Sequence, residues 1–177
     1  MSNVLVISGS PSPTSKTELV GDLVARRLAE REWHVEHLKV RTLPPAPLLH
    51  ADITDPAIAR ALAQVAHADG IVLATPTYKA SFSGLLKTFL DVLPQYGFAH
   101  KAVLPLATGG STAHVLVLDY ALRPVVHSLG ARHVVQSFFL LDKHLETGDG
   151  HPRIDPRSTE LLDSVIEEFR KALVAAA

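Results

Sequence analysis

The chain has 177 residues, enough for one domain with a sizeable core and too few for two comfortable ones. Its 17 basic and 18 acidic side chains nearly cancel, which argues against a nucleic acid or a membrane surface as partner. It has no cysteine, so disulfides, thiolate metal ligands and a cysteine nucleophile are excluded. Without a signal-like start or an apolar run of membrane-spanning length, the sequence predicts a single cytoplasmic domain, residues 1–177.

Short apolar runs alternate with amphipathic stretches along the whole chain. Strands are expected at 3–8, 34–40, 70–75, 102–107 and 134–141. Helices are expected at 17–30, 55–68, 83–93 and 112–129 and from 155 onward, with a proline-rich loop at 43–49. Asp55 and Asp155 are each followed by proline, the pattern of an N-cap with proline in the first helical turn.

This alternation predicts an α/β fold. Near-continuous apolar strands separated by helices are typical of a parallel sheet covered on both faces. Since crossovers are right-handed, we expect a flavodoxin-like, doubly wound sheet of five strands in the order 2-1-3-4-5. Ligands of such sheets bind beyond the carboxyl ends of the strands, so the loops after the first, third and fourth strands should hold the functional residues.

The loop after the first strand reads GSPSPTSKTEL, residues 9–19. It supplies several hydroxyls and the charge of Lys16, and it leads into the amino terminus of a helix. Backbone N–H groups, hydroxyls and the helix dipole at such a place bind phosphate well. The loop matches neither GxGxxG nor GxxxxGK[ST], and an ordinary N-cap with a polar turn is the alternative.

The other two loops favour a flat ligand. In TPTYKASFSGLLKTFLD, residues 75–91, Pro76 and Tyr78 can form an apolar wall, although a proline turn into a core helix would look similar. In LATGGSTAH, residues 106–114, Gly109 and Gly110 allow the backbone to approach a ligand closely, unless the loop is simply flexible. Together the three loops indicate a site for a planar ring with one phosphate, such as flavin mononucleotide (FMN).

The stretches GSPxxxS…L, TPxYKxxxSGxLKxxLD and LPLATGGxxAHxLxxDYALxPV resemble the NAD(P)H-dependent FMN reductases of flavodoxin-like fold. Among these, the chain is most similar to the flavin reductases of two-component alkanesulfonate monooxygenase systems. The resemblance implies that the first loop holds the FMN phosphate and the other two hold the flavin ring. The implied residues are Ser10, Ser15, Lys16 and Thr17 for the phosphate, and Pro76, Thr77, Tyr78, Lys79, Thr108, Gly109, Gly110 and Ser111 for the ring. Many relatives carry an arginine where this chain has Ser12, and Lys16 would replace that charge.

The fourth predicted helix contains the stretch LDYALRPVV, in which Pro124 stands four residues after Tyr120. Proline has no N–H, so the Tyr120 carbonyl lacks its helical partner, and a bulge is one of few comfortable solutions. The resemblance implies a π-type insertion at this tyrosine and a subunit interface, hence a homodimer or homotetramer. We hypothesise that the bulge loosens flavin binding, whereas a proline kink with a packing tyrosine is the alternative.

The resemblance implies hydride transfer from NADPH, or from NADH, to FMN. Reduced FMN would pass to a partner monooxygenase, in line with organosulfur desulfonation. The flavin carries this chemistry, so no catalytic side chain is expected. No histidine spacing suited to a metal and no GxSxG nucleophile motif occurs. The alternatives are a quinone or azo reductase with tightly bound FMN, a flavodoxin-like electron carrier, and a redox-sensing module.

Overall fold

A parallel sheet forms the centre of the computed structural model, which describes residues 2–30, 33–148 and 152–176. Its strands follow the order β2-β1-β3-β5-β6, with β7 also beside β5, and all these pairs are parallel. The predicted order 2-1-3-4-5 is confirmed, because β6 and β7 share the place of the fifth strand. The strands are β1 (Asn3–Ser8), β2 (His34–Lys39), β3 (Gly70–Tyr78), β5 (Ala102–Gly109), β6 (His133–Val134) and β7 (Phe138–Leu141).

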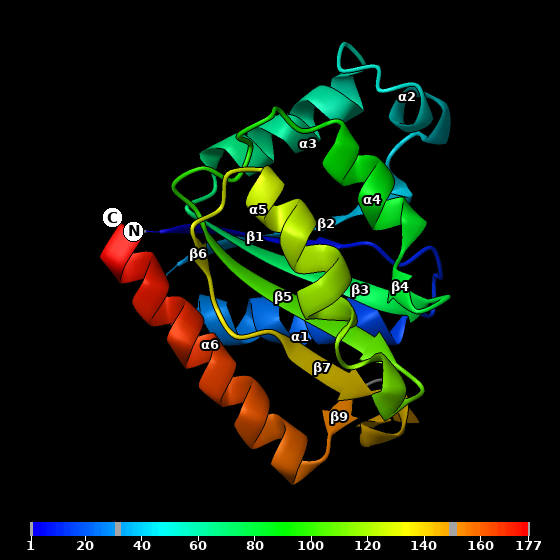
Figure 1. Ribbon diagram of the computed structural model, residues 1–177, viewed down its shortest axis with the longest axis vertical. Helices are drawn as coiled ribbons and strands as arrows, with labels where there is room; N and C mark the ends of the chain where they lie inside the picture. The colour runs from blue at the N-terminus through cyan, green and yellow to red at the C-terminus, as the bar shows by residue number, and fades with distance from the viewer. Residues whose placement is uncertain (1, 31–32, 149–151, 177) are drawn as a thin grey trace.

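Helices cover both faces of this sheet (Figure 1). On one face lie α1 (Lys16–Ala29) and α6 (Pro156–Ala176), and on the other lie α3 (Pro56–His67), α4 (Gly84–Asp91) and α5 (Arg123–Ser128). Side chains of β1 alternate between the two layers: Val4 and Val6 pack with α1 and α6, and Leu5 and Ile7 pack with the other three helices. Apolar side chains on both faces explain why the strand reads as a continuous apolar run.

Short elements complete the described chain. The remaining helical turns are η1 (Val40–Thr42), α2 (Pro45–Leu49), η2 (Thr112–His114), η3 (Leu118–Leu122) and η4 (Asp142–His144). The remaining strands are β4 (Ser81–Phe82), which pairs with β3, and the hairpin of β8 (Leu145–Glu146) and β9 (Arg153–Ile154). The prediction of a loop over 43–49 is therefore wrong in part, because Pro45 stands in the first turn of α2, a position that suits proline.

The predicted fifth strand is interrupted between β6 and β7. The guanidinium of Arg123 donates to the carbonyls of Val134 and Val135, each at 3.2 Å, and to Ser137 Oγ at 3.0 Å. These bonds give the backbone at the break a partner outside the sheet. The sequence pattern of the strand itself contains no sign of this partner.

The fourth predicted helix is divided into η2, η3 and α5. The segment η3 is a π-helix that contains Tyr120, and the Arg123 N–H donates to the Leu118 carbonyl five residues earlier. Because Pro124 has no N–H to donate, an ordinary helical bond to the Tyr120 carbonyl is impossible. The predicted π-type bulge is confirmed.

Side chains cap three helices, and the N-cap predicted at Asp55 is confirmed. Asp55 Oδ1 accepts from the N–H groups of Ala57 and Ile58, and Ser83 Oγ accepts from Leu86 N at 3.1 Å. Ser15 Oγ caps α1 by accepting from Glu18 N at 3.1 Å. These bonds satisfy backbone donors that a helix leaves unpaired at its start.

Across the described residues, every helix is too short or too polar to cross a lipid bilayer.

Candidate functional site

A cleft of about 220 Å³ opens at the carboxyl edge of β1, β3 and β5. It is lined by Ser10, Ser12, Thr14, Ser15, Lys16, Thr17, Pro76, Thr77, Tyr78, Thr108, Gly109, Gly110 and Asp142. Ten of the twelve predicted ligand-binding residues are therefore brought together. Lys79 and Ser111 do not line the cleft, and Asp142 does so although the sequence offered no signal for it.

The first loop is arranged by its own hydroxyls. Thr14 N donates to Ser12 Oγ at 3.2 Å, and Ser12 N donates to Ser10 Oγ at 3.3 Å. The loop leads into α1, whose first residues, Lys16 and Thr17, also line the cleft. A helix amino terminus surrounded by hydroxyls and one ammonium group favours an anion.

Two contacts attach this loop to distant parts of the chain. Thr17 Oγ1 lies 2.6 Å from Thr108 Oγ1, near the end of β5, and both residues are buried. Lys16 Nζ donates to the main-chain oxygen of Asp142, at the start of η4, at 2.8 Å. The first loop, the β5 loop and the segment after β7 thus form one continuous wall.

The second wall comes from β3, which extends to Tyr78. Lys79 and Ala80 form the tight turn to β4, with φ of 49° and 59°. Residues other than glycine and asparagine rarely adopt this left-handed backbone conformation, and residues strained in this way concentrate at functional sites. Thr77 Oγ1 is buried and, among the described residues, has no hydrogen-bond partner. A ligand in the cleft could supply that partner.

Two glycines line the cleft for different reasons. A Cβ at Gly109 would lie 2.8 Å from Phe139 Cζ and 3.3 Å from Thr77 Oγ1, so a side chain does not fit there. A Cβ at Gly110 would meet its nearest atom, Asp142 Oδ2, only at 4.0 Å, so the space beside it is open. Ser111, next along the chain, caps η2 by accepting from Ala113 N at 3.2 Å.

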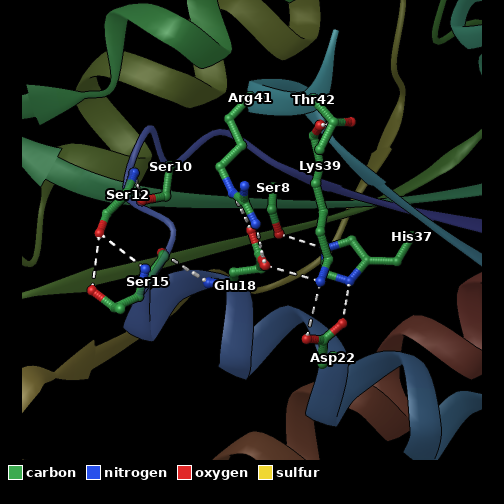
Figure 2. A network of polar contacts seen from close by, with 11 residues as sticks. Ser8, Ser10, Ser12, Ser15, Glu18, Asp22, His37, Lys39, Arg41 and Thr42 are labelled. Atoms are coloured by element: carbon green, nitrogen blue, oxygen red, sulfur yellow. Dashed lines mark hydrogen bonds and ion pairs between the residues drawn. The ribbon is translucent and has the colours of Figure 1, made fainter.

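Figure 2 shows a polar network that continues from the first loop to β2. Ser8 Oγ lies 2.6 Å from His37 Nε2, and His37 Nδ1 lies 2.7 Å from Asp22 Oδ1. Serine, histidine and aspartate follow one another here as in hydrolases, but Ser8 is only 1% exposed and no substrate can reach its hydroxyl. Burial lowers the pKa of His37, and the carboxylate of Asp22 opposes this shift.

Glu18, in the first turn of α1, is the centre of the charged part of this network. Arg41 binds its carboxylate through Nε at 2.9 Å and a terminal nitrogen at 3.1 Å, and Lys39 Nζ lies 2.9 Å from it. Burial acts to raise the pKa of Glu18, but the hydrogen bonds from Arg41 and Lys39 outweigh it, so the pKa is lowered. The negative charge beside the helix amino terminus is thus compensated within the protein.

A larger cavity, of about 610 Å³, runs along the whole length of β2 beside α3, from Asn3 and His34 to Thr42 and Leu43. It lacks the glycines and the hydroxyl-rich loop of the cleft, and it follows the side of an edge strand, whereas a doubly wound sheet binds its ligand beyond the carboxyl ends of the strands at the switch point. Within the described part of the chain, no three His, Asp or Glu side chains are placed to hold a metal ion.

Comparison with known proteins agrees with this geometry. Residues 2–146 match the family model of NADPH-dependent FMN reductase. A protein of Pseudomonas putida named FMN reductase (NADPH) is 41% identical over 172 residues, which are 96% of this chain and 87% of that protein. An Escherichia coli protein of the same name is 37% identical over 170 residues, which are 96% of this chain and 89% of that protein.

Among solved structures, the apo form of an NADH:FMN oxidoreductase superposes with a TM-score of 0.90 at 43% identity. The match covers 97% of this chain and 90% of that one. Sequence and fold therefore agree, and the chain belongs to the NADPH-dependent FMN reductase family.

Proposed function

We propose that the protein reduces FMN with NAD(P)H and releases the reduced flavin to a separate monooxygenase. One observation carries this proposal: the cleft joins a hydroxyl-rich helix amino terminus, suited to a phosphate, to walls of proline, tyrosine and glycine, suited to a flat ring. When bound, FMN supplies the hydride-accepting chemistry, and the protein binds and orients it.

The phosphate would be held by Ser10, Ser15, Lys16 and Thr17. The Lys16 ammonium reaches no carboxylate within the described residues and donates only to a main-chain oxygen, so it has donors left for an anion. Glu18, although near, has its charge compensated by Arg41 and Lys39. These features fit a phosphate group at the start of α1.

The ring would lie against Pro76, Thr77, Tyr78, Thr108, Gly109 and Gly110. The buried Thr77 hydroxyl, without a described protein partner, fits a ligand bearing hydrogen-bonding groups. The absence of a side chain at Gly110 leaves room for a flat group. Lys79 and Ser111 each follow a lining residue directly, so they would contact parts of the ligands outside the cleft.

Shallow binding supports a flavin that enters and leaves during turnover. The cleft of about 220 Å³ is smaller than the roughly 300–1,000 Å³ of typical ligand pockets, and Tyr78 is 47% exposed. A flavin there would keep part of its ring at the surface. The turn that follows Tyr78 leads into β4, which lies against the π-helix η3, so the bulge and the proposed ring site are neighbours.

Two further observations bear on the choice of nucleotide and on the assembly. Two of the relatives above have NADPH in their names, and the protein of the solved structure is named as an NADH:FMN oxidoreductase. We therefore propose NADPH as the hydride donor, with NADH as the alternative. Val115 and Leu116, just before η3, and Tyr120 within it are all exposed. An apolar patch of this kind fits a homodimer or homotetramer.

The test is NADPH oxidation by flavin-free protein under anaerobic conditions, followed by nicotinamide absorbance while FMN is titrated. We expect saturable oxidation whose amplitude is stoichiometric with the FMN added. Retention of one FMN per chain, with turnover only after a quinone or azo dye is supplied, would instead indicate a tightly bound prosthetic group. No oxidation under either condition would reject the reductase function.

A further inference from the structure

We propose that Asp142 lowers the affinity of the cleft for phosphorylated flavins, so that it determines both the choice of flavin and its release. The inference rests on the proposed function, because it assumes that the cleft binds FMN. It concerns a residue that the sequence pattern did not single out, and it assigns a role to a negative charge in a cleft otherwise suited to an anion.

The contacts of Asp142 place it between the phosphate end and the ring wall of the cleft. Its main-chain oxygen accepts from Lys16 Nζ at 2.8 Å, so the residue lies beside the first loop. Its Oδ2 points toward Gly110, since it is the nearest atom, at 4.0 Å, to a Cβ placed there. Asp142 is half-buried, and its side chain belongs to the lining of the cleft.

The Asp142 carboxylate differs from the other carboxylate near the first loop. Glu18 is bound by Arg41 and Lys39, at 2.9 Å each, and its charge is compensated. In the described residues, by contrast, no hydrogen bond or ion pair holds the Asp142 carboxylate, and Lys16 binds its main-chain oxygen instead. Its field therefore acts on whatever anion occupies the cleft.

A carboxylate that has no ion-pair partner among the described residues and a phosphate dianion repel each other in one small cleft, and a partly closed site screens this repulsion less than bulk water. The repulsion depends on the charge of the phosphate. Riboflavin, which has the same ring system and ribityl chain without the phosphate, is not subject to it. Asp142 should therefore weaken FMN binding selectively and speed its exchange.

The experiment measures the binding of FMN and of riboflavin to the whole protein by quenching of flavin fluorescence, at low and at high salt. The variants are Asp142→Asn, which keeps the size of the side chain, and Asp142→Ala. Glu168→Gln is the matched control, because it removes one negative charge from an exposed position on α6. The melting temperature of each variant verifies its folding.

For Asp142→Asn we expect the FMN Kd to fall about three- to tenfold at low salt, with a smaller gain at high salt. The riboflavin Kd should change less than about twofold, and Glu168→Gln should match the wild type. Steady-state assays should show a lower KM for FMN and, where flavin release limits turnover, a lower kcat.

Unchanged or weaker FMN binding in both Asp142 variants would overturn the inference, as would an equal gain for the two flavins. If the wild type binds and reduces FMN while the variants behave like it, only the role of Asp142 is rejected. If the wild type binds neither flavin, the proposed function fails and this inference fails with it.

Discussion

Thr17 Oγ1 and Thr108 Oγ1 lie 2.6 Å apart and join the first turn of α1 to β5, across 91 residues of sequence. Both residues are buried, so water does not compete for this bond. The loops on either side of the pair are the two that flank the cleft. This pair of hydroxyls therefore helps to fix their relative position, and with it the distance between the proposed phosphate and ring sites.

Replacing either threonine alone should leave an unpaired hydroxyl in the interior, whereas replacing both should not. Thr17→Val or Thr108→Val leaves the other hydroxyl buried without its partner, and we expect a loss of about 1–3 kcal/mol in the free energy of unfolding. The double variant should lose less than the sum, because neither hydroxyl is left unpaired. Urea unfolding of all four proteins measures this coupling. Additive losses would mean that the hydroxyls contribute independently. Thr112→Val, at an exposed position, is the control.

Gly109 and Gly110 should respond differently to alanine. At Gly109 the added Cβ would press against Phe139 Cζ at 2.8 Å, so Gly109→Ala should lose about 1–3 kcal/mol of stability together with FMN binding. At Gly110 the Cβ enters open space, so Gly110→Ala should keep its melting temperature and raise the Kd for FMN. Thermal melts and flavin titrations separate the two effects. An FMN Kd that is unchanged in Gly110→Ala would mean that the ligand does not lie over this residue.

The sequence predicted the cleft well because its residues directly follow strands. Once β1, β3 and β5 are recognised as parallel neighbours, their carboxyl ends must meet at one edge, and ten of the twelve predicted residues lie there. The π-helix was predictable for a similar reason. Pro124 excludes one particular backbone bond, whatever the tertiary structure is.

Other features depend on contacts that no local pattern encodes. Asp142 reaches the cleft only because the chain after β7 folds back onto Lys16, 126 residues earlier. The break between β6 and β7 depends on the guanidinium of Arg123, which comes from a different element. Nothing in the sequence distinguishes His37 from the other histidines, yet its ring connects β1 to α1 through hydrogen bonds with Ser8 and Asp22. Lys79 and Ala80 adopt a left-handed turn without the glycine or asparagine that would have indicated it.

The buried His37 predicts a pH dependence of stability. Its pKa is lowered from the usual value of 6.5 chiefly by burial, so the unfolded chain binds the proton more readily than the folded protein. The stability that the neutral ring contributes is complete above the unfolded pKa, and it is lost as the pH falls through the lower folded pKa. We therefore expect the melting temperature of the wild type to fall as the pH drops below about 6.5.

Replacing the ring tests this assignment. His37→Gln should be less stable than the wild type at neutral pH, and its melting temperature should vary less with pH over this interval. His133→Gln, at an exposed position, should keep the wild-type profile. If His37→Gln and the wild type have parallel profiles, another group causes the pH dependence.

Pro124 offers the most direct way to change the π-helix without touching the cleft. In Pro124→Ala the backbone gains an N–H that can donate to the Tyr120 carbonyl, so the ordinary helical bond becomes possible and the bulge should shorten. Because η3 lies against β4, next to the turn that follows Tyr78, we expect tighter FMN binding and slower release of reduced flavin. Flavin titration and a stopped-flow transfer assay measure these quantities, with Pro45→Ala, in the exposed first turn of α2, as the control.

Tyr120→Ala separates the bulge from the side chain that it presents. Tyr120 is 78% exposed, so its replacement should change the free energy of unfolding of the single chain by less than about 0.5 kcal/mol. If the ring reaches a neighbouring subunit, the variant should dissociate at higher protein concentration than the wild type in sedimentation experiments, and its FMN Kd should change. An unchanged FMN Kd in both Tyr120→Ala and Pro124→Ala would mean that η3 has no influence on the flavin, and the bulge would then be no more than the accommodation of a proline.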